Sequence, residues 1–191
     1  MDRTANRKGD WCQTYRGGLF WPLDPRADEV DPLDIAHALS LMCRFNGHCL
    51  RFYSVAEHSV RVSEETAKYV GGQQDRWVQL AGLLHDAAEA YVADIVRPLK
   101  RFLPGYGEIE NRVQAAVWQR FGVPVDAQVS SVVKKCDNIL LATEARDLMA
   151  PPPVAWHLDE KPSKRTIRPW SPAEAEHSFL ARLAELWPEG A

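Results

Sequence analysis

The chain has 191 residues, of which 46% are hydrophobic and 26% are charged. These values are ordinary for a soluble globular protein, and they exclude a disordered tail, a collagen-like repeat and a coiled-coil rod. The formal net charge of −3 at pH 7 argues against duplex nucleic acid as a partner, because proteins that bind it usually carry a basic surface. We expect one domain over residues 1–191, since domains commonly have about 100–200 residues.

The sequence carries no pattern for export or for a membrane. No apolar run approaches the roughly 18 residues of a membrane-spanning helix, and the polar N-terminus lacks the apolar segment of a signal peptide. The four cysteines form no CxxC pair, which fits reduced thiols. We therefore predict a cytoplasmic protein with no membrane partner.

An N-terminal extension over residues 1–31 is rich in Gly, Pro, Asp and Arg. Within it, Gly17 and Gly18 separate two short runs of apolar and aromatic residues, 12–15 and 19–21. This arrangement predicts a short β-hairpin.

Apolar residues that recur three and four positions apart predict helices for most of the remaining chain. The expected helices cover residues 32–44, 54–70, 74–93, 106–121, 126–149 and 171–186. Ser54 with Glu57, and Ser171 with Glu174, have the spacing of capping boxes. A C-terminal extension, 151–191, follows, with a short strand expected at 166–168. The predicted fold is all-α, with a short N-terminal β-hairpin and a minor C-terminal strand.

Charged side chains interrupt the most apolar of these helices. His85, Asp86 and Glu89 fall within five residues there, and Asp94 follows shortly after. Buried charges are costly unless they are paired or bind a metal. On a helix, His85 and Glu89 share a face, and His85 and Asp86 can flank one ion. The alternative is a core histidine that bonds to its neighbouring aspartate.

Two further polar residues lie on apolar helices, His58 after the Ser54 cap and Asp137 within 126–149. Each alone is typical of an ordinary core or surface residue. Together with His85 and Asp86, however, three separate helices each contribute a side chain that can bind a metal. Two imidazoles and two carboxylates suit Mn, Fe, Co, Ni or Zn better than Ca.

The pattern His58, His85-Asp86, Asp137 resembles the H…HD…D signature of the HD-domain metal-dependent phosphohydrolases. The surrounding residues, 53–59, 85–95 and 134–137, are similar to the bacterial 5′-deoxynucleotidase branch, which includes phage dATP triphosphohydrolases. The resemblance covers about residues 34–149 and leaves both extensions outside. It implies an HD-domain helical bundle and a homo-oligomer, a dimer or higher.

The resemblance also implies roles for individual residues. His58, His85, Asp86 and Asp137 would hold one divalent transition metal. Glu89 would be the general acid or base, and Asp94 would orient the attacking water or protonate the leaving oxygen. In the triphosphate-cleaving relatives, the carboxylates that match Glu89 and Asp94 can hold a second metal, for which Mg is a candidate.

The expected substrate-binding residues are Arg44, Phe45, Asn46 and Lys100. Arg44 and Phe45 match a phosphate-binding arginine and the aromatic residue that follows it in the nucleotidases. Arginine can grip a phosphate with two N–H groups, and an aromatic ring can stack on a base or sugar. The alternative for Arg44 is a helix-end residue that serves the helix dipole. For Lys100 it is a solvated charged face.

The resemblance favours hydrolysis of a deoxynucleoside monophosphate to the deoxynucleoside and phosphate. A dNTP triphosphohydrolase that releases triphosphate is the first alternative, because the sequence does not separate the two reactions. A non-catalytic nucleotide-binding regulator is the alternative of another class, and the presence of Glu89 and Asp94 argues against it.

Overall fold

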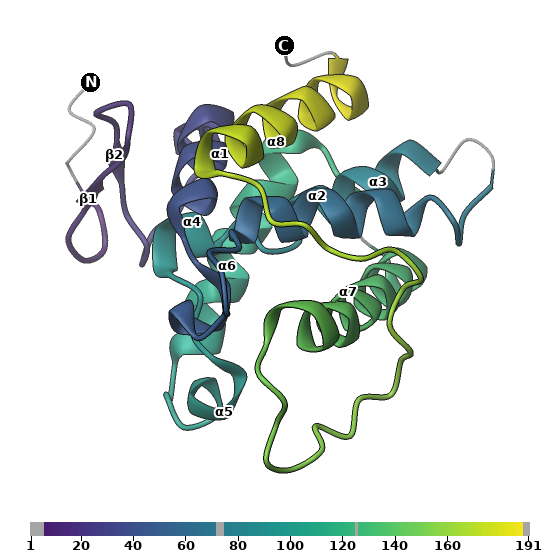
Figure 1. Cartoon of the computed structure of the whole chain (residues 1–191). Coiled ribbons are helices and arrows are strands. Elements are labelled where there is room, and N and C mark those ends of the chain that lie inside the picture. The colour runs from purple at the N-terminus through teal and green to yellow at the C-terminus, as the bar shows by residue number, and fades with distance from the viewer. Residues whose placement is uncertain (1–5, 72–74, 125, 189–191) are drawn as a thin grey trace.

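The computed structural model describes residues 6–71, 75–124 and 126–188 of the chain. It confirms the all-α fold with a short N-terminal β-hairpin (Figure 1). In chain order the elements are β1 (Cys12–Gln13), β2 (Leu19–Phe20), η1 (Ala27–Glu29), α1 (Pro32–Leu41), η2 (Arg44–Gly47), α2 (Val55–Thr66), α3 (Asp75–Leu84), α4 (Glu89–Val92), α5 (Arg97–Lys100), α6 (Tyr106–Phe121), α7 (Ala127–Leu148) and α8 (Pro172–Leu186).

The predicted hairpin pairs β1 with β2 in antiparallel register, with Cys12 opposite Phe20. Gly17 takes the turn at a φ of 80°, which side chains other than glycine rarely adopt. The buried Phe20 ring stacks on Tyr91 of α4 at a centroid distance of 3.8 Å. The hairpin is therefore joined to the helical core by an aromatic contact.

Polar side chains begin the long helices where the sequence predicted them. The Ser171 hydroxyl accepts from the Glu174 N–H and the Glu174 side chain bonds back, so the capping box of α8 is complete. The Ser54 hydroxyl accepts from the Glu57 N–H at 3.1 Å. The capping box at Ser54 is only half formed, because the Glu57 carboxylate binds Arg61 instead.

Helix α2 lies at the centre of the bundle and packs against α1, α3, α7 and α8 (Figure 1). Close contact between α2 and α3 depends on Gly82, where a Cβ atom would lie 3.1 Å from the Cα of Ser63. One cluster of buried apolar side chains extends from Phe20 through these helices to Leu186. Helix α8 of the C-terminal extension thus contributes to the same core as the central helices.

The prediction of one continuous helix over 74–93 is wrong in the middle of that range. Helix α3 ends at Leu84, residues 85–88 form a turn, and α4 begins at Glu89; position 74 lies outside the described residues. A continuous helix would bond the Leu84 carbonyl to the Ala88 N–H. Instead, the Gln114 amide from α6 donates to Leu84 O at 2.8 Å and accepts from Ala88 N at 3.1 Å. This inserted side chain stabilises the break that carries His85 and Asp86.

Three other predicted boundaries are corrected. The strand at 166–168 is absent from the described tail, because the Ile167 N–H donates to the Asp147 carboxylate at 2.8 Å rather than to a strand. The helix predicted to reach Arg44 ends at Leu41, and the Arg44 N–H donates to Tyr53 O at 2.9 Å. Arg44 is therefore not a helix-end residue of α1. The helix predicted to reach Val70 ends at Thr66.

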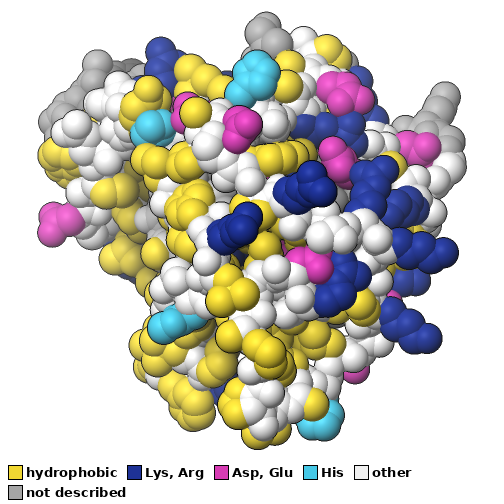
Figure 2. Space-filling view, viewed as in Figure 1, with side chains coloured by type: hydrophobic (Ala, Val, Ile, Leu, Met, Phe, Trp, Pro, Cys, Tyr) yellow, Lys and Arg dark blue, Asp and Glu magenta, His cyan; other side chains and the backbone are white. Residues whose placement is uncertain are grey.

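Exposed hydrophobic side chains gather on one part of the surface. Figure 2 shows them at the lower end of the face, over α5 and the loop that follows α7. The large exposed apolar residues of α5, of the turn directly after it and of the loop after α7 are Leu99, Phe102, Leu103, Val154 and Trp156.

The tail between α7 and α8 is fastened along α2 and α7. The Ser163 N–H donates to the Thr143 hydroxyl at 2.8 Å, and the Trp170 N–H donates to Glu57 at 2.8 Å.

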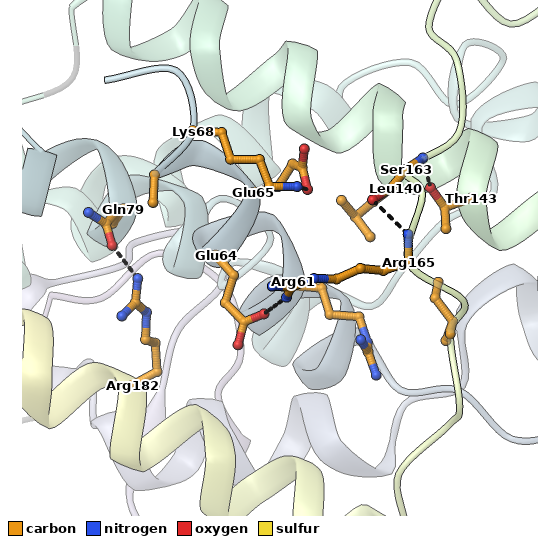
Figure 3. A pocket seen from close by; sticks show the side chains of 12 residues that line it. Arg61, Glu64, Glu65, Lys68, Gln79, Leu140, Thr143, Ser163, Arg165 and Arg182 are labelled. Atoms are coloured by element: carbon orange, nitrogen blue, oxygen red, sulfur yellow. Dashed lines mark hydrogen bonds and ion pairs between the residues drawn. The ribbon is translucent and has the colours of Figure 1, made fainter. Parts of the chain in front are cut away.

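A cavity of about 380 Å³ lies beside the contact between Ser163 and Thr143, which both line it (Figure 3). Its four cationic side chains all have partners within the chain: Arg61 with Glu57, Lys68 with Glu65, Arg165 with Glu64, and Arg182 with Glu185.

Candidate functional site

The structure brings the four predicted metal ligands together. His58 comes from α2, His85 and Asp86 from the turn after α3, and Asp137 from α7. The Nε2 atoms of His58 and His85 are 3.3 Å apart. His85 Nε2 lies 3.1 Å from Asp86 Oδ2, and His58 Nε2 lies 3.4 Å from Asp137 Oδ1. The donor atoms of His58, His85 and Asp86 all lie within 4.8 Å of one another, so this group can hold a metal ion.

The hydrogen bonds of the two imidazoles fit a cation between them. His85 Nδ1 lies 2.9 Å from the Gly82 carbonyl, which can only accept, so this nitrogen carries the proton. His58 Nδ1 lies 2.6 Å from a Glu144 carboxylate oxygen and donates in the same way. Without a further proton or a metal ion, the two Nε2 atoms, 3.3 Å apart, would then direct lone pairs toward each other. Such a pair is repulsive unless a proton or a metal ion lies between them.

The charges around the pair also favour a cation. Burial acts to raise the pKa of Asp86 and Asp137, but His85 and His58 outweigh it and hold both pKa values well below their usual range. Burial and the Arg44 charge act to lower the pKa of His58, but Glu144 and Asp137 outweigh them and raise it to about 9. The carboxylates thus remain ionised and attract positive charge.

Glu144 is a residue of the candidate site that the sequence reasoning missed. It is fully buried on α7 and joins two predicted site residues. One carboxylate oxygen binds His58, and the other accepts from Arg44 Nε at 3.3 Å and Nη2 at 3.2 Å. Burial acts to raise its pKa, but Arg44 and His58 lower it, so Glu144 is charged. The sequence did contain a sign of this role: Glu144 follows Asp137 by seven residues, which places both side chains on one face of the helix.

Arg44 lies between this carboxylate and the candidate metal ligands. Its Nη1 atom is 3.6 Å from Asp86 Oδ2, while Nε and Nη2 bind Glu144. Burial acts to lower the pKa of Arg44, but Glu144 and Asp86 raise it further above its usual value. Glu144 accepts from Nε and from one N–H of Nη2, so the N–H groups of Nη1 and the second N–H of Nη2 are left for a ligand.

A cavity of about 780 Å³ adjoins these residues. Arg44, Phe45, His48, Asp86, Glu89, Asp94, Ile95, Val96, Arg97, Pro98, Lys100, Lys134, Asp137, Leu141, Met149, Trp156 and Leu158 line it. Both predicted catalytic carboxylates are therefore part of its wall. Glu89 Oε2 is buried and has no hydrogen-bond partner among the described residues. Burial, together with nearby carboxylates, raises the pKa of Glu89 and of Asp94.

The predicted substrate-binding residues divide into two groups. Arg44, Phe45 and Lys100 line the cavity, although Lys100 also binds Glu110 at 2.6 Å. Asn46 is exposed and does not line it. Trp156, also part of the wall, belongs to the C-terminal extension and had no predicted role.

Of the five non-glycine residues with positive φ in the described part of the chain, all but Asn6 lie in the cavity wall or next to a residue of it. Phe45, Asn46, Ala93 and His157 are non-glycine residues with φ values of 55°, 52°, 71° and 48°. Each such conformation costs about 1–3 kcal/mol and persists only where the surroundings enforce it. Phe45 lines the cavity, and Ala93 and His157 adjoin the lining residues Asp94 and Trp156. Strain of this kind is typical of functional sites.

In the described parts of the chain, none of the helices combines the length and apolar character needed to cross a lipid bilayer.

The fold and the site define an all-α protein with a candidate metal centre at the wall of a large cavity. No protein-family model matches the chain. The uncharacterized protein YfdR of Escherichia coli (strain K12) is 36% identical to it over 179 residues, 92% of this chain and 95% of YfdR. The uncharacterized protein RCAP_rcc00048 of Rhodobacter capsulatus is 37% identical over 146 residues, 74% of each chain. The chain belongs to the protein family of YfdR and RCAP_rcc00048.

Proposed function

We propose that the protein is a metal-dependent phosphohydrolase of the HD-domain type that acts on nucleotides, in the first place as a 5′-deoxynucleotidase. The observation that carries the proposal is the pair of imidazole Nε2 atoms, 3.3 Å apart, flanked by Asp86 and Asp137 at the wall of the cavity. Two ring nitrogens and two carboxylates that converge from three segments are a donor set that suits a transition metal.

His58, His85, Asp86 and Asp137 would hold the metal, and their mixed nitrogen and oxygen donors suit Mn, Fe, Co, Ni or Zn. When bound, such an ion supplies Lewis-acid chemistry, because it acidifies water and neutralises charge on a phosphoryl group. Glu144 would keep the His58 ring in its orientation through the bond to Nδ1. Carboxylate partners of this kind also make an imidazole a better ligand.

Glu89 is the proposed general acid or base. Glu89 lines the cavity, and its Oε2 atom is buried without a hydrogen-bond partner among the described residues. The carboxyl group can therefore take a proton from water or give one to a leaving oxygen. Asp94 lines the same cavity. In the proposed mechanism, its carboxylate orients the attacking water or protonates the leaving oxygen. Glu89 and Asp94 together are also the candidates for a second ion, such as Mg.

Arg44 is the proposed phosphate anchor. Its Nη1 atom lies beside Asp86, so a phosphate in the cavity can accept from it while Glu144 keeps the guanidinium fixed. A fixed donor costs no reorganisation when the negative charge arrives.

A dNTP triphosphohydrolase is the second candidate, and one observation favours it. Three further cationic residues, Arg97, Lys100 and Lys134, line the same cavity. A triphosphate needs more positive partners than a monophosphate does. To bind one, Lys100 would leave Glu110, at 2.6 Å, and Lys134 would leave Asp137, at 2.7 Å.

The test is to incubate the protein with each dNMP and dNTP in the presence of Mn²⁺ or Co²⁺ and to identify the phosphorus products by NMR. Inorganic phosphate from a dNMP supports the nucleotidase, and triphosphate from a dNTP supports the second candidate. Glu89→Gln should abolish most of the signal. Glu185→Gln, a conservative change at a largely exposed carboxylate, is the matched control. Nucleotide binding without any product would support the non-catalytic regulator and contradict the proposal.

A further inference from the structure

We propose that Trp156 is the residue on which the base of the nucleotide stacks, so that the loop 150–162 of the C-terminal extension forms part of the substrate site. This inference rests on the proposed function, and it adds a substrate-recognition residue outside the 34–149 segment that carries the metal ligands.

The cavity has two chemically different parts. Asp86, Asp137, Glu89 and Arg44 form a polar part, which with the proposed metal ion bound suits an anionic group. Phe45, Leu141, Met149, Trp156 and Leu158 provide aromatic and aliphatic wall. The volume of about 780 Å³ lies within the range of small-molecule sites and far exceeds that of a phosphate ion. A ligand that matches both parts has a phosphate group at one end and a flat, weakly polar body at the other.

Trp156 has the position and the exposure for such a contact. It is 41% exposed, so part of its ring surface is open to a ligand. Its ring centroid lies 6.0 Å from that of Phe45, at an interplanar angle of 49°. The two rings already touch, so a base has no room between them and would stack on the free face of Trp156. Phe45 then supports the tryptophan ring from the other side.

The backbone holds this loop over the cavity. At one end the Leu50 N–H donates to Leu148 O at 2.8 Å, and at the other end Ser163 is bonded to Thr143. Next to Trp156, His157 has a φ of 48°, a strained turn that fixes the direction of the chain.

Behind the loop, a second gap of about 350 Å³ separates it from α7, and Trp156 borders this gap as well. The ring is therefore not packed into the core, and its location at the cavity is not explained by burial of apolar surface.

The experiment compares Trp156→Ala with the parent in two assays. Calorimetry measures binding of a deoxynucleoside, which has the base but no phosphate. Kinetics measures kcat/KM for the matching dNMP and for deoxyribose 5-phosphate, which has no base. Loss of one base–aromatic stack should weaken nucleoside binding by about 5- to 150-fold. The preference for the dNMP over deoxyribose 5-phosphate should fall by a similar factor.

Two variants make the comparison specific. Trp156→Phe retains a ring and should recover most of the nucleoside affinity. Trp11→Ala removes a tryptophan of similar exposure, 49%, that does not line the cavity, and it should match the parent. Nucleoside affinity that is equal in Trp156→Ala and the parent, or absent from the parent, would overturn the inference. Parent protein that binds nucleosides through Trp156 but hydrolyses no nucleotide would contradict the proposed function and leave this inference standing.

Discussion

The substitution Glu144→Gln tests the buried network that connects Arg44 to the candidate metal centre. Glutamine has nearly the same shape but no charge and only one accepting oxygen, so it removes the negative partner of the Arg44 guanidinium and cannot accept from both Arg44 and His58 Nδ1. Glu144 is fully buried, and Arg44 is mostly so. Removing one partner of a buried ion pair costs about 3–5 kcal/mol, because an uncompensated charge stays behind.

For a chain of this length, 1 kcal/mol corresponds to roughly 2–4 °C in Tm. Glu144→Gln should therefore lower Tm by about 6–20 °C in thermal unfolding followed by circular dichroism. It should also weaken Mn²⁺ or Co²⁺ binding by about 10- to 100-fold, as changes to the partners of metal-bound histidines typically do. Isothermal titration calorimetry measures this second effect.

Glu185→Gln is the matched control, because the Glu185 side chain is 65% exposed although it lies 2.7 Å from Arg182. Exposed pairs contribute about 0–1 kcal/mol, so the control should keep nearly the parent Tm. If Glu144→Gln shows the same small change as Glu185→Gln, the charge of Glu144 does not stabilise the site, and the reasoning is refuted.

Three further predictions concern single residues. Glu89→Gln should lower kcat by about 10²- to 10⁴-fold while elemental analysis shows unchanged metal, and a full kcat would exclude the acid–base role. Ala93→Gly should raise the free energy of unfolding by about 1 kcal/mol in urea titration, since the backbone at φ 71° and ψ 155° suits only glycine; destabilisation would argue against strain there. Gln114→Ala should lower that free energy by about 1–3 kcal/mol and weaken Mn²⁺ binding, because the turn that carries His85 and Asp86 loses both its bonds to the amide. An unchanged affinity would show that the turn forms without Gln114.

The features that the sequence predicted well are those with local causes. The hairpin depends on a glycine pair between two short runs, and α8 begins at a complete capping box. The convergence of His58, His85, Asp86 and Asp137 was also predicted, because polar side chains on apolar helix faces must meet one another or a ligand.

The features that the sequence reasoning missed depend on residues far apart in the chain. The break at 85–88 is stabilised by Gln114, whose amide lies 30 residues from Leu84 and 26 from Ala88. The role of Glu144 depends on Arg44, 100 residues earlier. Trp156 reaches the cavity only because the tail folds back and bonds to α7. Periodicity describes one helix at a time and contains no information on such contacts.

The central claim is that His58, His85, Asp86 and Asp137 form one metal site. Elemental analysis of protein reconstituted with Mn²⁺ or Co²⁺ and then desalted tests it most directly, with Asp86→Ala beside the parent. We predict about one tightly held ion per chain in the parent and its loss in the variant, with the helical circular dichroism signal retained in both. Equal stoichiometric metal in Asp86→Ala and the parent, or a parent that retains no metal, would contradict the account.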